Sequence, residues 1–416
     1  MKYSAPKGFQ DILPPEISVW QRIEAAARSV FVKYGFHEIR LPIIEATDIF
    51  VRSIGEITDI VEKEMYTFRD KGDRSVTLRP EGTAGAVRCF VEHGLHNLPS
   101  PQKFYYAGPM FRYERPQKGR FRQFYQIGVE AFGAAQPALD AEIIAMLNDF
   151  LKSIGLLNLN FELNSIGCDV CRPVYKEALQ LFFRDKISGF CPDCNRRYNT
   201  NILRILDCKV ERCVELRGGA PAVSGHLCEH CRIHFDELTG LLETLDVPFS
   251  LNANLVRGLD YYTKTTFEVT SEHLGAQKAV AAGGRYDKLV KEFGGPDTPA
   301  IGFAIGMERL ATLLQTVVPP EKAAPKVFVA TLGKQADTEG LRITKSLRNN
   351  GLWVEPSYGG ASLKSQLRKA DRIGAEYAVI LGENELSSGK AQWKNLKEGT
   401  QGEVALTELQ AFFAKA

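Results

Sequence analysis

The stretch 104-FYYAGPMFRYERPQKGRFRQFYQIGVEAF-132 decides the fold of this chain. Its two ends, Phe104 to Tyr106 and Phe124 to Val129, alternate aromatic and apolar residues in the manner of strands. The loop between them holds five cations against one acid, Glu114. We therefore predict a β-hairpin whose tip binds an anion. The five cations are Arg112, Arg115, Lys118, Arg120 and Arg122.

Residues Gln126 and Glu130 on the returning strand add groups of a second kind. They lie four residues apart and therefore on one face of a strand. Arginine suits phosphate because its planar fork makes paired, charge-assisted hydrogen bonds. A carboxylate beside such a loop indicates a ligand that carries both signs of charge. The alternative is a solvated, charged hairpin whose Gln and Glu face water.

The composition is that of a soluble globular protein with more than one domain. The chain has 416 residues, of which 44% are hydrophobic and 25% charged. Because the net charge is only +2, a nucleic-acid surface must come from local clusters of cations. The N-terminal MKYSAPKGFQDILPPE lacks the apolar core of a signal peptide, and no run approaches the roughly 18 apolar residues of a membrane helix. We expect a cytoplasmic protein.

Eight of the nine cysteines form four close pairs between residues 160 and 235. Both spacings, C-x2-C and one pair with four intervening residues, are within zinc-ligand range, so the pairs could supply two structural sites of four thiolates each. Chance pairing of buried cysteines and a redox dithiol are the alternatives. Nearby, His226, His230 and His234 could replace a thiolate. The pairs are Cys168 with Cys171, Cys191 with Cys194, Cys208 with Cys213, and Cys228 with Cys231.

Two segments place polar residues beside expected strand ends. In SVTLRPEGTAGAVRCFVEH, Glu81 lies at the start of a helix that begins near Gly82 or Thr83, where backbone N–H groups are free. A simple helix N-terminal acid is the alternative. In RGLDYY, Arg257 is either paired with a nearby carboxylate such as Asp260 or poised for a ligand, because an unpaired buried cation is costly.

The remaining segments set the domain organisation. Apolar residues at helical spacing after Pro15 predict an amphipathic helix ending before Gly35, and FHEIRLPII (36–44) follows as a strand. PAIGFAIGMERL (299–310) predicts a strand leading into the helix that carries Arg309. The proline-rich VVPPEKAAPK (317–326) marks a boundary, beyond which strands and helices alternate in βαβαβ order. One of those helices carries four cations, which either form a solvated face or touch RNA phosphates: Lys364, Arg368, Lys369 and Arg372.

Taken in order, these segments resemble the class II aminoacyl-tRNA synthetases and, within them, the histidyl-tRNA synthetases. FHEIRLPII resembles motif 1, FRYERPQKGRFRQFYQIGVE motif 2 and PAIGFAIGMERL motif 3, whereas LRPEGT, RGLDYY and AAGGRYDKL resemble segments of the histidine enzymes. The resemblance covers nearly the whole chain and implies an α+β fold. It comprises a catalytic domain at 1–320 with an antiparallel sheet flanked by helices, a cysteine-rich insertion at 160–235, a linker at 321–325 and an α/β anticodon-binding domain at 326–416.

The resemblance also implies roles for individual residues. As catalytic residues, Arg112 and Arg257 would contact the α-phosphate of ATP and Arg309 the γ-phosphate. In AAGGRYDKL, Gly283 and Gly284 would let the backbone pass close to the ligand. Histidine would be bound by Glu81, Thr83, Gln126, Glu130, Tyr261 and Tyr262. ATP would also contact Arg120 and Phe124, and the tRNA acceptor end would contact Gln117, Arg115 and Arg122.

The implied activity is the ATP-dependent ligation of histidine to tRNA(His), with Mg²⁺, by a homodimer. Structural zinc, where bound, would serve stability and not the chemistry. The first alternative is a catalytically inactive, synthetase-like regulatory subunit of histidine biosynthesis. Such paralogues typically lack the C-terminal domain and depart from the RGLDYY arginine, both of which this chain retains. The second alternative is a zinc-stabilised RNA-binding protein without activity.

Overall fold

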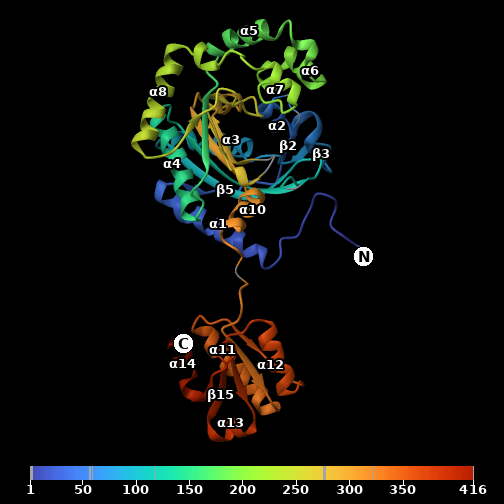
Figure 1. The fold of residues 1–416 in the computed structure, drawn as a ribbon, viewed down its shortest axis with the longest axis vertical. Helices are drawn as coiled ribbons and strands as arrows, with labels where there is room; N and C mark the ends of the chain where they lie inside the picture. The colour runs from blue at the N-terminus through green and yellow to red at the C-terminus, as the bar shows by residue number, and fades with distance from the viewer. Residues whose placement is uncertain are drawn as a thin grey trace. The chain divides into compact units, whose positions relative to one another are not determined.

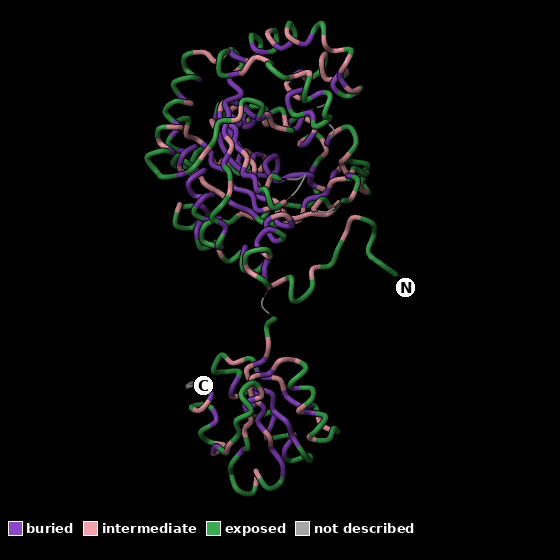
Figure 2. The backbone as a smooth tube through the Cα atoms, in the orientation of Figure 1, coloured by how far each residue is buried: buried purple, intermediate pink, exposed green. Residues whose placement is uncertain are grey.

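The chain folds into two compact units, Met1–Pro320 and Glu321–Ala416 (Figure 1). The structure is a computed structural model that describes residues 3–55, 58, 60–117, 119–274, 278–320 and 322–415. Of the expected linker 321–325, residue 321 lies outside this description and residues 322–325 form neither helix nor strand. In both units the buried residues follow the strands, whereas the outer turns of the helices are exposed (Figure 2).

An eight-stranded sheet organises the described part of the first unit, in the order β1-β5-β6-β11-β10-β9-β7-β8. Its second and third strands form the predicted hairpin, which is confirmed and is longer than the sequence indicated, because β5 (Gln102–Phe111) and β6 (Gln123–Phe132) pair over their full length. Neighbouring strands are antiparallel except at the two edges, where β1 pairs with β5 and β8 with β7 in parallel. The other strands are β1 (His37–Glu38), β7 (Asn160–Ser165), β8 (Ser250–Leu251), β9 (Thr263–Thr270), β10 (Ala279–Arg285) and β11 (Ala300–Gly306).

One face of this sheet packs on α1 (Glu16–Phe31), α4 (Pro137–Ser153) and α10 (Met307–Val317). The predicted amphipathic helix is α1, which buries Trp20, Ile23 and Phe31 and is followed by a 3-10 turn that ends at Gly35 in the left-handed conformation. Strand residues alternate between faces. Consequently Tyr105, Ile127 and Val129 join this core, whereas their neighbours face the opposite side.

The opposite face is covered by α3 (Thr83–Glu92) and α9 (Leu289–Glu292). Helix α3 begins at Thr83, as predicted, and is preceded by a small sheet of β2 (Ile44–Ala46), β4 (Ser75–Leu78) and β3 (Tyr66–Arg69) with helix α2 (Thr47–Ile54). FHEIRLPII is therefore not one strand. Only His37–Glu38 and the residues from Ile44 onward pair, on either side of the proline.

The cysteine-rich insertion is a helical layer with a core of its own. It contains α5 (Cys171–Phe183), α6 (Pro192–Thr200) and α7 (Glu211–Leu216), which lie together in Figure 1, and it returns to the sheet through α8 (Glu229–Thr244). Helix α8 packs against α4. The insertion thus leaves the sheet after β7 and rejoins it at β8.

The C-terminal unit is an α/β layer structure. Three strands pair in parallel, namely β13 (Val354–Pro356), β12 (Val327–Thr331) and β14 (Tyr377–Leu381). They are connected in the chain by α11 (Lys334–Asn349) and α12 (Leu363–Arg372), which confirms the predicted βαβαβ order. The sequence did not predict the antiparallel extension by β15 (Lys390–Asn395) and β16 (Gln401–Ala405). In the described part of the chain, no helix is long and apolar enough to cross a membrane.

Candidate active site

A cavity of about 290 Å³ brings together three arginines from distant parts of the sequence. Arg112 directly follows β5, Arg257 lies between β8 and β9, and Arg309 is in the first turn of α10. The cavity therefore lies across the middle of the sheet, on the face opposite α1. Ten of the predicted site residues line it: Glu81, Thr83, Arg112, Arg120, Phe124, Gln126, Arg257, Tyr261, Tyr262 and Arg309.

Arg112 and Arg309 are held by backbone carbonyl groups. The Nε of Arg112 donates to the oxygen of Pro80 at 2.9 Å, and its guanidinium lies 5.3 Å from the ring centre of Phe124. Arg309 donates from Nη1 to Ala279 at 3.0 Å. Burial lowers the pKa of both groups, because removing a cation from water disfavours the charged form. An anionic ligand would restore the lost stabilisation of these charges.

Arg257 is paired with a carboxylate, but not with the one that the sequence suggested. Its Nη1 lies 2.9 Å from Glu268 Oε2, whereas Asp260 accepts a hydrogen bond from Asn201 instead. Asp260 was the wrong choice because the loop turns its side chain toward the insertion, while β9 carries Glu268 to the cavity. Burial opposes the charge of Arg257, yet Tyr262 and Glu268 outweigh it and raise the pKa.

Glu130 lies directly beneath the cavity and is not itself part of the wall. It is 1% exposed, and its two oxygens accept hydrogen bonds from Tyr106 (2.9 Å) and from Tyr286, which is on the cavity wall. Burial raises the pKa of Glu130 to about 8, against the lowering effect of these hydrogen bonds. The site thus contains a carboxyl group that titrates near neutral pH.

Glycines make the room that these side chains occupy. A Cβ at Gly302 would collide with the Glu130 carboxylate, and one at Gly128 would collide with the ring of Tyr106. Gly283 and Gly284 serve a similar purpose, because the atoms nearest to a Cβ there belong to the neighbouring strands and to Tyr262. The sequence suggested that these two glycines bring the backbone close to a ligand, whereas in the structure they allow close packing between strands.

Glu81 combines both interpretations that the sequence left open. Its carboxylate accepts from the backbone N–H groups of Thr83 (2.6 Å) and Ala84 (2.8 Å), so it caps α3. It also lines the cavity, and burial raises its pKa. Being a helix-start acid therefore does not keep Glu81 from facing the cavity.

Apart from Glu114 Oε2, which is ion-paired with Arg120, two buried polar atoms on the cavity wall have no hydrogen-bond partner among the described residues, namely Gln126 Oε1 and Arg257 Nε. Buried polar groups are almost always satisfied, and an unsatisfied one costs about 1–3 kcal/mol. One is an acceptor and the other a donor. A ligand with both a donor and an acceptor would fit this pair.

The tip of the hairpin contributes less to the cavity than its cations suggested. Arg115 and Gln117 are exposed, and Arg122 lies with its guanidinium 3.8 Å from the ring centre of Tyr113 and donates to Glu114 O at 3.2 Å. Arg120 forms an ion pair with Glu114. Lys118 lies outside the described residues. Part of the positive charge is thus neutralised within the loop.

Comparison with known proteins decides the family. A sequence profile described as histidyl-tRNA synthetase matches residues 8–178 and 210–310. The chain belongs to the histidyl-tRNA synthetase family. A second profile, described as an anticodon binding domain, matches residues 326–416 and hence the C-terminal unit.

Alignments with relatives cover nearly the whole length of this family member. The histidine–tRNA ligase of Thermodesulfovibrio yellowstonii is 53% identical over 409 residues, which cover 98% of this chain and 97% of the relative. That of Trichlorobacter lovleyi is 52% identical, with coverage of 98% and 96%. The crystal structure of apo histidyl-tRNA synthetase from S. aureus superimposes with a TM-score of 0.83 at 38% identity and covers 99% of both chains.

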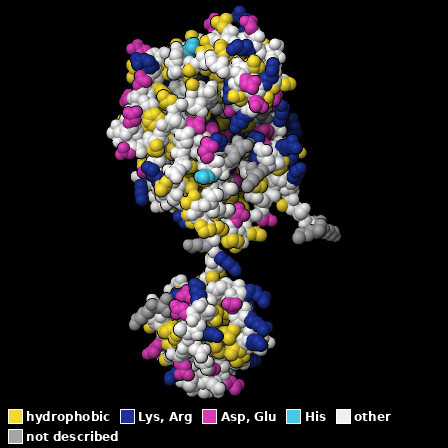
Figure 3. Space-filling view, in the orientation of Figure 1, with side chains coloured by type: hydrophobic (Ala, Val, Ile, Leu, Met, Phe, Trp, Pro, Cys, Tyr) yellow, Lys and Arg dark blue, Asp and Glu magenta, His cyan; other side chains and the backbone are white. Residues whose placement is uncertain are grey.

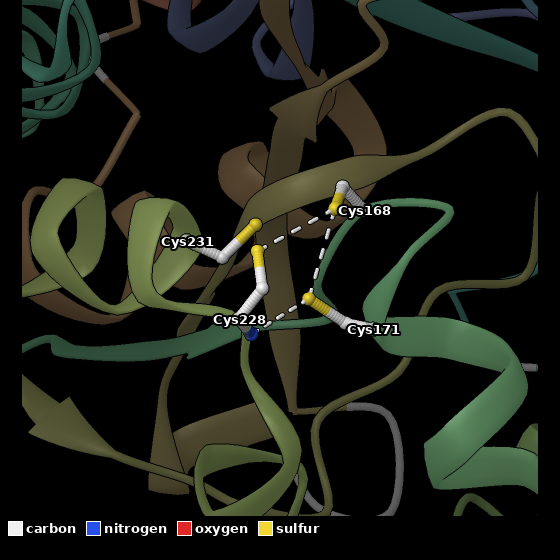
Figure 4. Close-up of side chains that lie close together, drawn as sticks. All are labelled: Cys168, Cys171, Cys228 and Cys231. Atoms are coloured by element: carbon white, nitrogen blue, oxygen red, sulfur yellow. Dashed lines mark hydrogen bonds between the residues drawn. The ribbon is translucent and has the colours of Figure 1, made fainter.

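The cysteines of this histidyl-tRNA synthetase family member form two clusters of four. Among the described residues, Cys168, Cys171, Cys228 and Cys231 have their sulfur atoms within 4.8 Å of one another (Figure 4), as do Cys191, Cys194, Cys208 and Cys213. Four thiolates about 2.3 Å from a tetrahedral zinc ion lie about 3.8 Å apart. The Sγ–Sγ distances of 3.7 Å for Cys168–Cys171, 3.8 Å for Cys168–Cys228 and 3.9 Å for Cys191–Cys208 fit this geometry.

The nearby histidines take no part in either cluster. His234 is buried and lies 3.0 Å from Asp140, and His226 contacts the carbonyl oxygen of Ala222. Most of the second cluster lies in residues 179–209, which separate the two stretches matched by the family profile. That cluster is part of the cysteine-rich insertion.

Sequence reasoning missed four residues that shape the site: Tyr106, Tyr286, Glu268 and Arg285. Arg285 is completely buried, with ion pairs to Asp140 (2.7 Å) and Asp287 (2.9 Å). The sequence signal that could have identified two of them was the motif AAGGRYDKL, which contains both Arg285 and Tyr286. Glu130, the partner of Tyr286, and Asp140, one partner of Arg285, come from distant parts of the sequence, whereas Asp287, the other partner of Arg285, is in the same stretch.

In the C-terminal unit, Lys and Arg side chains gather along the edge where α12 lies (Figure 3). All four predicted cations of this helix are exposed. The opposite side of α12 buries Gln366 and Ala370. An exposed cationic face on a packed helix is able to meet a polyanion.

Proposed function

We propose that this protein is a histidine–tRNA ligase, which activates L-histidine with ATP and transfers the histidyl group to the 3′ end of tRNA(His). The observation that carries the proposal is the convergence of Arg112, Arg257 and Arg309 on one cavity whose base is Glu130 with its two tyrosines. The full-length relatives named histidine–tRNA ligase support it.

In the first step, a carboxylate oxygen of histidine attacks the α-phosphorus of ATP. The new O–P bond gives histidyl-adenylate, and the bond to the leaving pyrophosphate breaks. Such transfers depend on alignment and on neutralisation of charge. We assign Arg112 and Arg257 to the α-phosphate and Arg309 to the γ-phosphate, with Phe124 stacked on adenine and Arg120 beside the nucleotide.

Mg²⁺ fits this cavity as a companion of the ATP phosphates. The four carboxylates on the wall already have partners. Glu268 pairs with Arg257 and Glu308 accepts from the backbone N–H of Tyr125. Glu81 caps α3, and Glu114 pairs with Arg120. The ion would therefore take most of its ligands from phosphate and water, and it would neutralise negative charge on the phosphate oxygens.

The choice of histidine follows from hydrogen bonding. Glu81, Thr83 and Gln126 would hold the α-amino end, and Glu130, Tyr261 and Tyr262 the imidazole, with Tyr286 as a further contact. Imidazole has a donor and an acceptor on opposite sides of its ring. An apolar amino acid would leave both partners buried and unpaired, which excludes it without an editing domain.

In the second step, the ribose hydroxyl at the tRNA 3′ end attacks the carbonyl carbon of the adenylate, and AMP leaves. We assign the exposed Arg115 and Gln117, together with Arg122, to the acceptor end. The four cations of α12 would meet the anticodon arm. The catalytic domain in this proposal is residues 1–320, and 326–416 is the anticodon-binding domain joined by 321–325.

We further propose that each cysteine cluster binds one structural zinc ion, held by four thiolates and remote from the chemistry. The protein would act as a homodimer in the cytoplasm. Exposed Ile43 and Ile44, at the end of the segment that resembles motif 1, support a self-contact there.

The test of the function is histidine-dependent exchange of pyrophosphate into ATP. Arg257→Ala should lower kcat by about 10²–10³, because it removes a charge that acts mainly in the transition state. The exposed Arg69→Ala is the matched control and should exchange normally. Near-normal exchange by Arg257→Ala would remove its assigned role. Histidine binding without any exchange by the unaltered protein would favour a regulatory subunit, and neither binding nor exchange would favour an RNA-binding protein.

A further inference from the structure

The loop that carries Arg257, Tyr261 and Tyr262 lies outside regular secondary structure. It runs from Asn252 to Tyr262 and connects β8 with β9. A reaction that depends on alignment needs side chains placed to within about 0.5 Å, and loops do this less well than helices or strands. Contacts from elsewhere must therefore fix this loop.

Its two ends are fixed by the sheet. The buried Asn164 on β7 donates to the carbonyl oxygen of Leu255 at 2.9 Å. At the other end, Lys264 has a φ of 49°, an uncommon conformation for a residue with a side chain. It exchanges backbone hydrogen bonds with Ile166 (2.8 Å) and Gly167 (2.9 Å), which hold it in place.

The middle of the loop is fixed from the insertion. Arg204 donates from Nη1 to the carbonyl oxygen of Arg257 at 3.3 Å, and Asn201 donates from Nδ2 to Asp260 Oδ1 at 2.8 Å. Even a Cβ on Gly258 would lie only 3.0 Å from Arg204 Nη1, so the guanidinium is close against the backbone. These contacts bracket the interval between Arg257 and Tyr261.

Asn201 and Arg204 are themselves on a well-anchored segment. Ile202 and Ile205, which alternate with them, are buried in the core of the insertion, and Val256 of the loop packs against that same core. The segment lies between Cys194 and Cys208, whose sulfur atoms belong to one cluster. It also falls within residues 179–209, outside the stretches matched by the family profile.

We propose that Asn201 and Arg204 are positioning residues for histidine activation, which hold the Arg257–Tyr262 loop in its working conformation from the helical insertion. Neither side chain lines the active-site cavity, so each acts through the loop. Arg204 acts on the backbone of the arginine assigned to the α-phosphate, and Asn201 acts next to the tyrosines assigned to histidine. The proposal rests on the proposed ligase function.

The test compares Arg204→Ala and Asn201→Ala with Lys209→Ala, which replaces an exposed cation just after this segment. In pyrophosphate exchange, Arg204→Ala should lower kcat by between about tenfold and a hundredfold with little change in the KM for ATP. Asn201→Ala should raise the KM for histidine by about tenfold, and Asn201→Asp should do so more strongly because it places a carboxylate against Asp260. Lys209→Ala should resemble the unaltered protein.

Two further measurements separate positioning from loss of folding. Arg204→Lys keeps a donor and should recover most of the kcat. Amide hydrogen exchange of folded Arg204→Ala and Asn201→Ala should speed up across residues 255–262 and not across β5 or β6. The proposal would be overturned if Arg204→Ala and Asn201→Ala matched Lys209→Ala in both kinetics and amide hydrogen exchange. It would also be overturned if amide hydrogen exchange rose over the whole unit even in Arg204→Lys. If the unaltered protein showed no pyrophosphate exchange, the proposed ligase function would be wrong instead. The amide hydrogen-exchange comparison would still show whether Asn201 and Arg204 hold the loop in place.

Discussion

At the scale of the residue, the chemistry of the site depends on ionisable groups that are kept out of water. Glu130 lies beneath the cavity with both oxygens occupied by tyrosine hydroxyls, and Arg257 is surrounded by Glu268 and Tyr262. These groups have little freedom to reorient when a ligand enters. Such preorganisation is the main means by which a protein stabilises developing charge.

Glu130 should make histidine binding depend on pH. Because burial raises its pKa to about 8, the carboxyl is mostly protonated at neutral pH in the free protein. If imidazole donates to the carboxylate, binding must release this proton, so histidine affinity should rise severalfold between about pH 7 and pH 8. Calorimetry in buffers of different ionisation enthalpy measures both the affinity and the proton released.

Glu130→Gln is the control for this dependence, because glutamine keeps the shape and cannot titrate. It should bind histidine more weakly and with no change over the same pH range. The stability effect has a definite sign. The folded-state pKa lies above the ordinary value of 4.5, so the free energy of unfolding that this carboxyl contributes falls as the pH rises toward about 8. A pH-independent affinity in the unaltered protein would contradict the assignment.

The sequence predicted those site residues that lie in recognisable local spellings. Arg112, Glu81 and Arg309 follow directly from a strand end or a helix start, which a linear pattern can indicate. Glu268 could not be identified as the partner of Arg257, because their contact depends on the path of an irregular loop. Residues 106 and 286 were missed for a similar reason, since strand pairing brings them to Glu130.

At the scale of the element, the cysteine clusters replace a large apolar core. The helices of the insertion are short, and their core contains Cys194, Cys208 and Cys213 beside aromatic side chains. Small helical layers of this kind commonly need metal or disulfide cross-links. All nine cysteines are free thiols in this structure, so a metal is the cross-link that their geometry suits.

Protein purified without chelators should contain about two equivalents of zinc per chain. Cys194→Ser should lose about one equivalent and lower the thermal stability, since it removes a ligand from one cluster only. Cys89→Ser is the matched control, because Cys89 is a half-buried cysteine on α3 outside both clusters. Elemental analysis by mass spectrometry gives the count, and less than about one equivalent in the unaltered protein would count against both sites.

At the scale of the whole molecule, alternating patterns gave the architecture of each unit but not its edges. The hairpin, the first helix and the parallel C-terminal strands are all confirmed, because each has strong periodicity. Strands β15 and β16 were missed because KAQWKN and QGEVA carry few apolar residues. Their place in the sheet comes from the pairing of β15 with β14 and of β16 with β15, and not from their own composition.

The division into two units should separate two activities. Replacing Lys364 and Arg368 with alanine should raise the KM for tRNA severalfold by removing phosphate contacts, and this effect should shrink as the salt concentration rises. Pyrophosphate exchange, which needs no tRNA, should be unchanged. Lys345→Ala on α11 is the control, since it removes an exposed cation from another helix of the same unit. Equal loss in exchange and in aminoacylation would contradict this separation.

The pairing of β6 with β11 has a consequence for synthesis of the protein. Phe132 is opposite Ala300, so the ribosome must make the whole insertion before the neighbour of β6 exists. At ordinary translation speeds this interval is on the order of ten seconds, during which one side of the newborn hairpin is an open edge that invites aggregation. We therefore expect nascent chains to acquire nucleotide affinity abruptly, when β11 emerges, and to depend on chaperones until then.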